Sequence, residues 1–175
     1  RTAARTFYSF EARRKLRSLI RDFKPDVAHV HNIYHQISPS ILTELKRAHV
    51  PVVYMLHDFH LLSPNYNLFA NGTIDECVKP NHIWRVVRHR CVKHSFAASL
   101  LAAAAMAFHR ALHIYEKNVD VFITPSKFLS ELLTEWGVHL RRVEVLRNFA
   151  SLMPQRKKQG EYFLYVGRLS PEKGV

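Results

Sequence analysis

Residues 51–59 read PVVYMLHDF, a proline followed by an apolar run and then by the polar pair His57-Asp58. The run VVYML is apolar at consecutive positions, which is typical of a strand in a parallel sheet whose two faces are both covered. Comparable runs stand at Val27–Val30, Val119–Thr124 and Val143–Leu146, with helical patterns between them. This alternation of strands and helices predicts an α/β fold with a doubly wound parallel sheet.

Helical patterns frame these strands. Residues 3–24 carry apolar side chains at helical spacing among arginines and lysines, which predicts one basic amphipathic helix with Phe7 and Phe23 on its apolar face. Ser38-Pro39 predicts the start of the next helix, and Ser126 and Gly137 predict the two ends of another. Residues 57–82 are rich in turn formers and predict an excursion from the sheet, whereas 83–117 predicts one or two long helices.

The chain divides near residue 150. Residues 150–160 are polar and basic, which is typical of a linker, and the apolar run Tyr162–Val166 predicts another buried strand. We therefore predict one domain over 1–149, a linker over 150–160 and the start of a second domain over 161–175. Because the first residue is Arg1 rather than Met, and SPEKGV begins a helical pattern at the other end, we expect a fragment that is truncated at both ends.

Composition restricts the class of protein. The 175 residues carry 26 Lys and Arg against 14 Asp and Glu, a formal net charge of +12 that favours anionic partners. An apolar fraction of 47% with 5 Gly and 8 Pro excludes disordered, collagen-like and low-complexity proteins. Few cysteines and no secretory leader predict a cytoplasmic protein. The apolar run Phe96–Phe108 is shorter than the roughly 20 residues that cross a bilayer.

Polar side chains follow each predicted strand, at the end where ligands bind in a parallel α/β sheet. His31-Asn32 and His57-Asp58 follow two of the strands, and Ser126 and Asn148 follow two others. Each group also has a structural explanation, since serine caps helices and asparagine suits turns. Because several strands deliver such groups to one edge, we expect a shared cleft that includes His31, Asn32, Ser126 and Asn148.

The segment Val166–Gly174, VGRLSPEKG, predicts a site for a diphosphate. Gly167 lets the backbone approach a ligand, SPE starts a helix, and Arg168 and Lys173 place two cations near the amino end of that helix. Unpaired N–H groups there, together with arginine and lysine, suit a pyrophosphate. A solvated turn is the structural alternative.

Taken in order, these motifs resemble the family 4 glycosyltransferases, retaining enzymes with two Rossmann-like domains in the GT-B arrangement. The resemblance covers about 25–175 and is carried by PDVAHVHN (25–32), PVVYMLHDF (51–59), VDVFITPSKF (119–128), VEVLRNF (143–149) and YVGRLSPEKGV (165–175).

The resemblance implies roles for individual residues. Gly167, Arg168 and Lys173 would bind the donor diphosphate, and His57, with Asp58 adjacent, would lie beside the donor sugar as the catalytic pair. The glycine-rich loop that the family carries near its amino terminus is missing, and so is its carboxy-terminal acidic motif. We therefore expect the fragment alone to be inactive.

The implied reaction moves a sugar from a nucleotide-diphosphate sugar to a glycan or lipid-linked acceptor, in cell-surface polysaccharide or glycolipid synthesis. Such a transfer needs charge stabilisation on the departing diphosphate and polar contacts around an oxocarbenium-like centre. Arg168 and Lys173 can neutralise the diphosphate without a metal, and no Asp-x-Asp pair occurs in the sequence. We therefore expect no metal and no cofactor.

The basic charge is also compatible with nucleic acid or an anionic membrane as the partner. A non-catalytic domain that binds nucleic acid or membrane is the alternative function, but Phe7 and Phe23 on an apolar face argue against stacking on bases, and we expect no nucleic acid. An anionic membrane surface fits better, which predicts a peripheral protein on the cytoplasmic face of the membrane. The residues that support it are Trp84, Val86 and Val87 among Arg85, Arg88, Arg90 and Lys93.

A metal site is a further alternative. Cys77 and Cys91 accompany His82, His89 and His94, but the two cysteines form no C-x-x-C pair, which structural zinc sites generally require.

Overall fold

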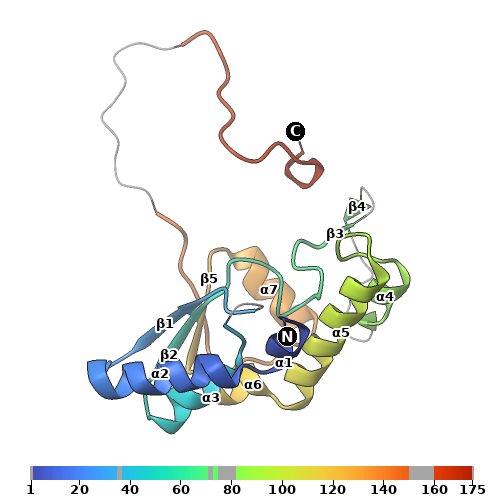
Figure 1. Cartoon of the computed structure of the whole chain (residues 1–175). Coiled ribbons are helices and arrows are strands. Elements are labelled where there is room, and N and C mark those ends of the chain that lie inside the picture. The colour runs from blue at the N-terminus through green and yellow to red at the C-terminus, as the bar shows by residue number, and fades with distance from the viewer. Residues whose placement is uncertain (1, 35–36, 71–72, 75–81, 150–159, 175) are drawn as a thin grey trace.

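The computed structural model describes residues 2–34, 37–70, 73–74, 82–149 and 160–174 (Figure 1). Its elements are α1 (Thr2–Phe7), α2 (Phe10–Phe23), β1 (Ala28–His31), α3 (Ser40–Arg47), β2 (Val52–Met55), β3 (Phe69–Ala70), β4 (Thr73–Ile74), α4 (Arg85–Arg88), α5 (Phe96–Ala111), α6 (Ile114–Asn118), β5 (Val121–Thr124), α7 (Lys127–Glu135), β6 (Val143–Val145) and a 3-10 turn at Pro171–Lys173.

The central sheet is parallel and has the strand order β1-β2-β5-β6. Its register pairs His31 with Met55 and Met55 with Ile123, so that β1, β2 and β5 reach the same edge. β3 and β4 form a separate antiparallel hairpin. The predicted fold class, an α/β fold with a parallel, Rossmann-like sheet, is confirmed.

Helices cover one face of the sheet closely. Val30, Val52, Tyr54 and Phe122 lie on that face by register and form one core cluster with apolar residues of α3, α6 and α7. The paired residues of the other face are half-buried or exposed, except for Met55. The two faces are therefore covered unequally within the part of the chain that the structure describes.

The segment 3–24 forms two helices rather than the single helix predicted. Ser9 separates them and caps α2, because its Oγ accepts a hydrogen bond from the backbone N–H of Ala12 (3.2 Å). Leu16 and Ile20 pack against the core, but Phe23 is 74% exposed. The prediction of a buried apolar face that includes Phe23 is thus wrong, because Phe23 is the last residue of α2, which ends at the left-handed Lys24.

Residues with a left-handed backbone conformation also place other helix boundaries away from the predicted positions. Ser38 has a φ of 76°, so α3 starts at Ser40 with Pro39 at its N-cap rather than Ser38. The region 83–117 forms three helices instead of one or two, because residues of positive φ, including Lys93 and His113, interrupt it. The predicted boundaries of α7 are confirmed, with Ser126 as its N-cap and Gly137 at a φ of 69° just beyond its end.

The strand predicted over Tyr162–Val166 is wrong. This segment pairs with none of the strands in the described residues, and its side chains are exposed, with Leu164 at 77%. Backbone groups without a neighbouring strand have no ladder to join, so an apolar run alone does not make a strand. The predicted linker over 150–160 lies, apart from Gly160, outside the described residues.

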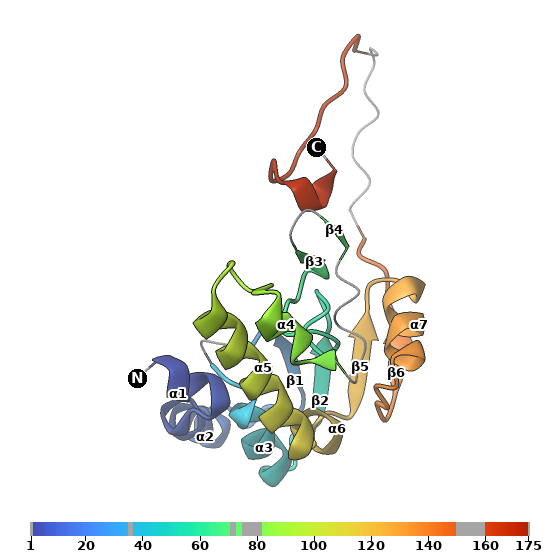
Figure 2. The same ribbon diagram turned by 90° about the vertical axis from the view of Figure 1, so that its right-hand side faces the viewer.

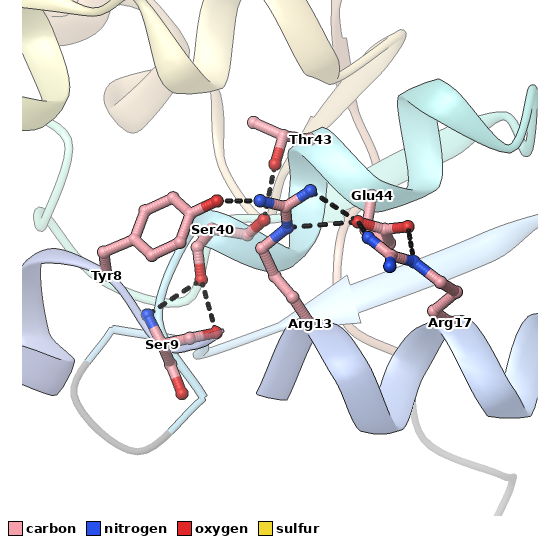
Figure 3. Close-up of polar contacts among 7 residues, drawn as sticks. All are labelled: Tyr8, Ser9, Arg13, Arg17, Ser40, Thr43 and Glu44. Atoms are coloured by element: carbon pink, nitrogen blue, oxygen red, sulfur yellow. Dashed lines mark hydrogen bonds and ion pairs between the residues drawn. The ribbon is translucent and has the colours of Figure 1, made fainter. Parts of the chain in front are cut away.

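A carboxylate joins α2 to α3 (Figure 3). Glu44, which is 6% exposed, accepts hydrogen bonds from Arg13 Nη2 (2.6 Å) and Arg17 Nε (2.6 Å). Its pKa is held down to about 2, first by the hydrogen bond from Arg17 and then, against the cost of burial, by Arg13. Arg13 also donates to the Tyr8 hydroxyl, and Ser9 N–H donates to Ser40 Oγ (3.1 Å). These contacts fix the helices that precede and follow β1.

Replacing Glu44 with alanine should lower the free energy of unfolding by roughly 3 kcal/mol, because Arg13 would remain buried without its acceptor. The pKa of Glu44 is depressed from 4.5 to about 2. Its stabilisation should therefore be complete above pH 4.5 and be lost as the pH falls from there toward 2. Urea denaturation of both chains at several pH values measures the difference.

Glu11→Ala is the matched control, since Glu11 pairs with the exposed side chains of Arg5 and Lys15. We expect a much smaller loss for this variant. Equal losses for Glu11→Ala and Glu44→Ala would contradict the anchoring part given to Glu44.

Candidate functional site at the carboxyl edge of the sheet

Two histidines from neighbouring strands meet at the carboxyl edge of the sheet. His31 ends β1, His57 follows β2, and His31 Nδ1 lies 2.6 Å from His57 Nε2. Their rings stack at 4.9 Å between centroids, and the ring of His29 lies 4.2 Å from that of His31. Burial lowers the pKa of His31, and the neighbouring His29 and His57 lower it further. In a hydrogen bond between two imidazoles, one ring nitrogen donates its N–H and the other accepts it.

Asp58 stands beside His57 and is held by contacts from two loops, one after β1 and its own after β2. Its Oδ1 accepts hydrogen bonds from the Tyr34 hydroxyl (2.9 Å) and from the backbone N–H of His60 (2.9 Å). Burial raises the pKa of Tyr34, and the charge of Asp58 adds to the shift, so this phenol remains a donor at ordinary pH. These contacts make the Asp58 carboxylate an anchor for the turn that carries His57.

A groove opens above this edge. Its walls come from the sheet edge, from the excursion after β2, from the first turn of α7 and from the carboxy-terminal segment. The lining residues are Asn32, His57, Asp58, Phe59, Tyr66, Asn67, Leu68, Phe69, Phe128, Arg168, Glu172 and Lys173. Figures 1 and 2 both show the carboxy-terminal turn next to β3 and β4. The groove therefore brings together residues that are more than a hundred positions apart in the sequence.

The carboxy-terminal cations lie around a short turn. Ser170 begins a 3-10 turn at Pro171–Lys173, so the helix predicted to start there is a single turn in the described residues. Arg168 is exposed, and its Nη2 lies 3.8 Å from Glu172 Oε1. Glu172, which the sequence analysis did not single out, thus reduces the positive charge that Arg168 and Lys173 bring to the groove.

The remaining predicted residues have different placements. Gly167 lies beside the Tyr165 ring, where an added Cβ would stand 2.8 Å from the Tyr165 hydroxyl, so the close approach at this glycine is to a side chain of the protein itself. Ser126 caps α7 through a hydrogen bond from Leu129 N (3.3 Å). Asn148 is exposed on the segment after β6 and is not among the groove residues.

Several groove residues were missed by the sequence analysis: Tyr66, Asn67, Leu68, Phe69 and Phe128. The turn formers at 63–65 gave the signal for the first four, because Asn65 holds this loop by donating from Nδ2 to the Phe69 carbonyl (2.9 Å). Phe128 gave no such signal, since an apolar residue in the first turn of a helix is ordinarily taken as core.

Among the described residues, no group of three or more His, Cys, Asp or Glu side chains is placed to hold a metal ion. Cys91 is partly buried, and Cys77, the other cysteine of the alternative metal site, lies outside the described residues.

Comparisons with known proteins agree with this arrangement. The family model for Glycosyltransferase Family 4 matches residues 2–152. The chain is 25% identical over 171 residues to a Klebsiella pneumoniae protein described as "Uncharacterized 42.6 kDa protein in cps region". The match covers 95% of this chain and 39% of that relative, so the chain spans about two-fifths of the relative's length. No solved structure matches. With a family match over most of its length and a parallel sheet that carries polar residues at its carboxyl edge, the chain belongs to glycosyltransferase family 4.

Proposed function

We propose that the chain is the acceptor-side part of a retaining glycosyltransferase of the GT-B type. It would transfer a sugar from a nucleotide-diphosphate sugar to a glycan or lipid-linked acceptor, in cell-surface polysaccharide or glycolipid synthesis at the cytoplasmic side of the membrane. Family membership supports the transferase class, and the name of the relative in a cps region supports polysaccharide synthesis. The observation that carries the proposal is the groove that combines His57 with Arg168 and Lys173.

The charges in this groove suit the departing group. In the transfer, the bond between the anomeric carbon and the diphosphate oxygen breaks, the oxygen of an acceptor hydroxyl bonds to that carbon, and the diphosphate leaves with the bonding electron pair and takes up the hydroxyl proton. Arg168 offers a two-pronged donor and Lys173 a point charge, and together they would stabilise this charge without a metal ion. Gly167 would also belong to the donor site as the neighbour of Arg168, and the Tyr165 ring that lies against it here would have to move for the diphosphate to approach its backbone.

Residues at the carboxyl edge of the sheet would contact the donor sugar. His57 lines the groove and is oriented by His31 through the 2.6 Å contact, so its ring is held where a sugar hydroxyl or the reacting centre would lie. Asn32 lines the same wall and adds an amide for sugar hydroxyls. We assign Asp58 a structural role rather than that of a general acid or base, because its Oδ1 already accepts hydrogen bonds from the Tyr34 hydroxyl and the His60 N–H.

Arg168→Ala and Lys173→Ala should each weaken binding of a nucleoside diphosphate about five- to thirtyfold, because an exposed charge-assisted contact contributes about 1 to 2 kcal/mol. His57→Ala should leave this affinity nearly unchanged and lower turnover of the enzyme that carries this chain. Calorimetric titration with UDP, GDP and ADP, together with steady-state kinetics, separates the two effects.

Arg147→Ala is the control, since Arg147 is exposed and is not among the groove residues. Unchanged nucleotide affinity in both cation variants would remove Arg168 and Lys173 from the donor site. Near-normal turnover in His57→Ala would remove that side chain from the chemistry and leave the family assignment standing.

Tyr34→Phe should lower the free energy of unfolding by about 1.5 kcal/mol, because the Asp58 carboxylate loses a buried hydroxyl donor. Tyr34 is 8% exposed, whereas Tyr66, the control for a Tyr→Phe change in the groove, is 43% exposed. Turnover should fall in Tyr34→Phe through displacement of the His57 turn, with nucleotide affinity retained. Chemical denaturation and kinetics of the two variants test this, and equal stability of Tyr34→Phe and the parent chain would contradict it.

A further inference from the structure

Helix α5 buries the polar residues Ser99 and His109 and exposes three large apolar residues, Phe96, Leu100 and Phe108. Ser99 and His109 are 0% and 4% exposed, and both form internal hydrogen bonds, Ser99 Oγ with Val92 N–H (3.1 Å) and His109 Nε2 with the Phe7 carbonyl (3.0 Å). Arg110 Nη2 donates to the carbonyl oxygens of Leu61 (2.8 Å) and Leu62 (3.1 Å). The polar groups of this helix are thus used inside the protein.

The outer face of α5 carries no polar side chain. Phe96 is 56% exposed, Leu100 41%, Phe108 37% and Leu112, which follows the helix, 47%. Ala104 stands between Leu100 and Phe108 and is partly exposed, so apolar residues repeat at every fourth position. Because four residues exceed one helical turn by about 40°, this stripe crosses the outer face obliquely over about 24 Å of helix, from Phe96 at one margin to Leu112 at the other. A surface helix normally presents charged and polar residues on this side, and an exposed apolar stripe of this length marks an interaction site.

Exposed cations lie directly before this stripe. Arg85, Arg88, Arg90 and Lys93 are exposed on α4 and on the turn that leads into α5, and Trp84 is 55% exposed beside them. None of these four cations forms an ion pair with another described residue. The sequence contains no Asp or Glu between His82 and Tyr115. Figure 2 shows α4 and α5 together on the side that faces the reader.

The valines predicted to belong to this surface do not contribute. Val86 and Val87 are 0% and 7% exposed and pack inward, so the apolar component comes from α5 instead. The other basic stretch, α2, uses several of its cations internally, since Arg13 and Arg17 pair with Glu44, and Lys15 pairs with Glu11.

We propose that the α5 stripe (Phe96, Leu100, Ala104, Phe108, Leu112) and the α4 cations (Arg85, Arg88, Arg90, Lys93) form a docking surface for an anionic lipid bilayer. The helix would lie in the plane of the interface, with its apolar side chains at the level of the acyl chains and the cations among phosphate headgroups. No helix among the described residues has the length and hydropathy to cross a bilayer, so the contact is one of surface docking. The proposal stands whether or not the chain takes part in glycosyl transfer.

Charge and apolar surface together favour an anionic bilayer over a second copy of the chain or a nucleic acid as the partner. A second copy would bring another net charge of +12 to the interface and would have to overcome that repulsion. Nucleic acid phosphates would satisfy the cations but would leave Leu100 and Phe108 in water. An anionic bilayer provides both the negative charge and the apolar layer.

The test is cosedimentation of the whole chain with equimolar phosphatidylcholine–phosphatidylglycerol vesicles, with pure phosphatidylcholine vesicles as the neutral reference. The chain should bind the anionic vesicles, and salt should weaken the binding. Arg88→Gln with Lys93→Gln, and separately Phe96→Gln with Leu100→Gln, should each weaken it at least about tenfold. In a Trp136→Phe background, Trp84 emission should shift to the blue on binding.

Arg14→Gln with Arg21→Gln on α2 is the matched control, because both residues are exposed cations outside this surface. It should retain most of the binding, and circular dichroism should show that every variant is folded. The proposal is overturned by absence of binding to anionic vesicles, by a loss confined to the α2 variant, by salt-resistant binding to DNA without vesicle binding, or by dimerisation that Leu100→Gln abolishes.

Discussion

Parallel pairing of β1, β2 and β5 is the constraint on which the site depends. In this register His31, Met55 and Ile123 stand level, so the residues that follow each strand leave the sheet at one edge. A one-residue slip would turn His31 to the opposite face and separate it from His57. The fully buried Tyr54 and Phe122 hold the register, because a slip would bring them out of the core as well.

The charged groups are of two kinds: some form hydrogen bonds within the fold, and others are left on the surface. Glu44 and Asp58 serve the fold, since one joins α2 to α3 and the other fixes the turn after β2. The charges left on the surface, Arg168 and Lys173 at the groove and Arg85 to Lys93 beside α5, have few internal partners and face regions where ligands can reach them. Two anionic ligands, a diphosphate and a lipid surface, would therefore meet separate parts of this basic chain.

Local sequence patterns predicted the strands and the edge where His31, Asn32, His57 and Asp58 lie, because consecutive apolar residues and the polar residue after them are local signals. Contacts between distant segments gave no such signal. The imidazole pair, the placement of Phe128 in the groove and the inward packing of Val86 depend on which elements become neighbours. Tyr162–Val166 failed as a strand for the same reason, since its apolar pattern specifies no pairing partner.

The sheet edge and the carboxy-terminal cations line one groove, and we propose that this groove binds the donor as a unit. The direct measurement is an NMR titration of the isotopically labelled chain with a nucleoside diphosphate, in which the signals of His57, Phe128 and Lys173 are followed together. All of these signals should shift along one binding curve with a single dissociation constant. Shifts at Lys173 alone, with His57 and Phe128 unchanged at saturation, would contradict it.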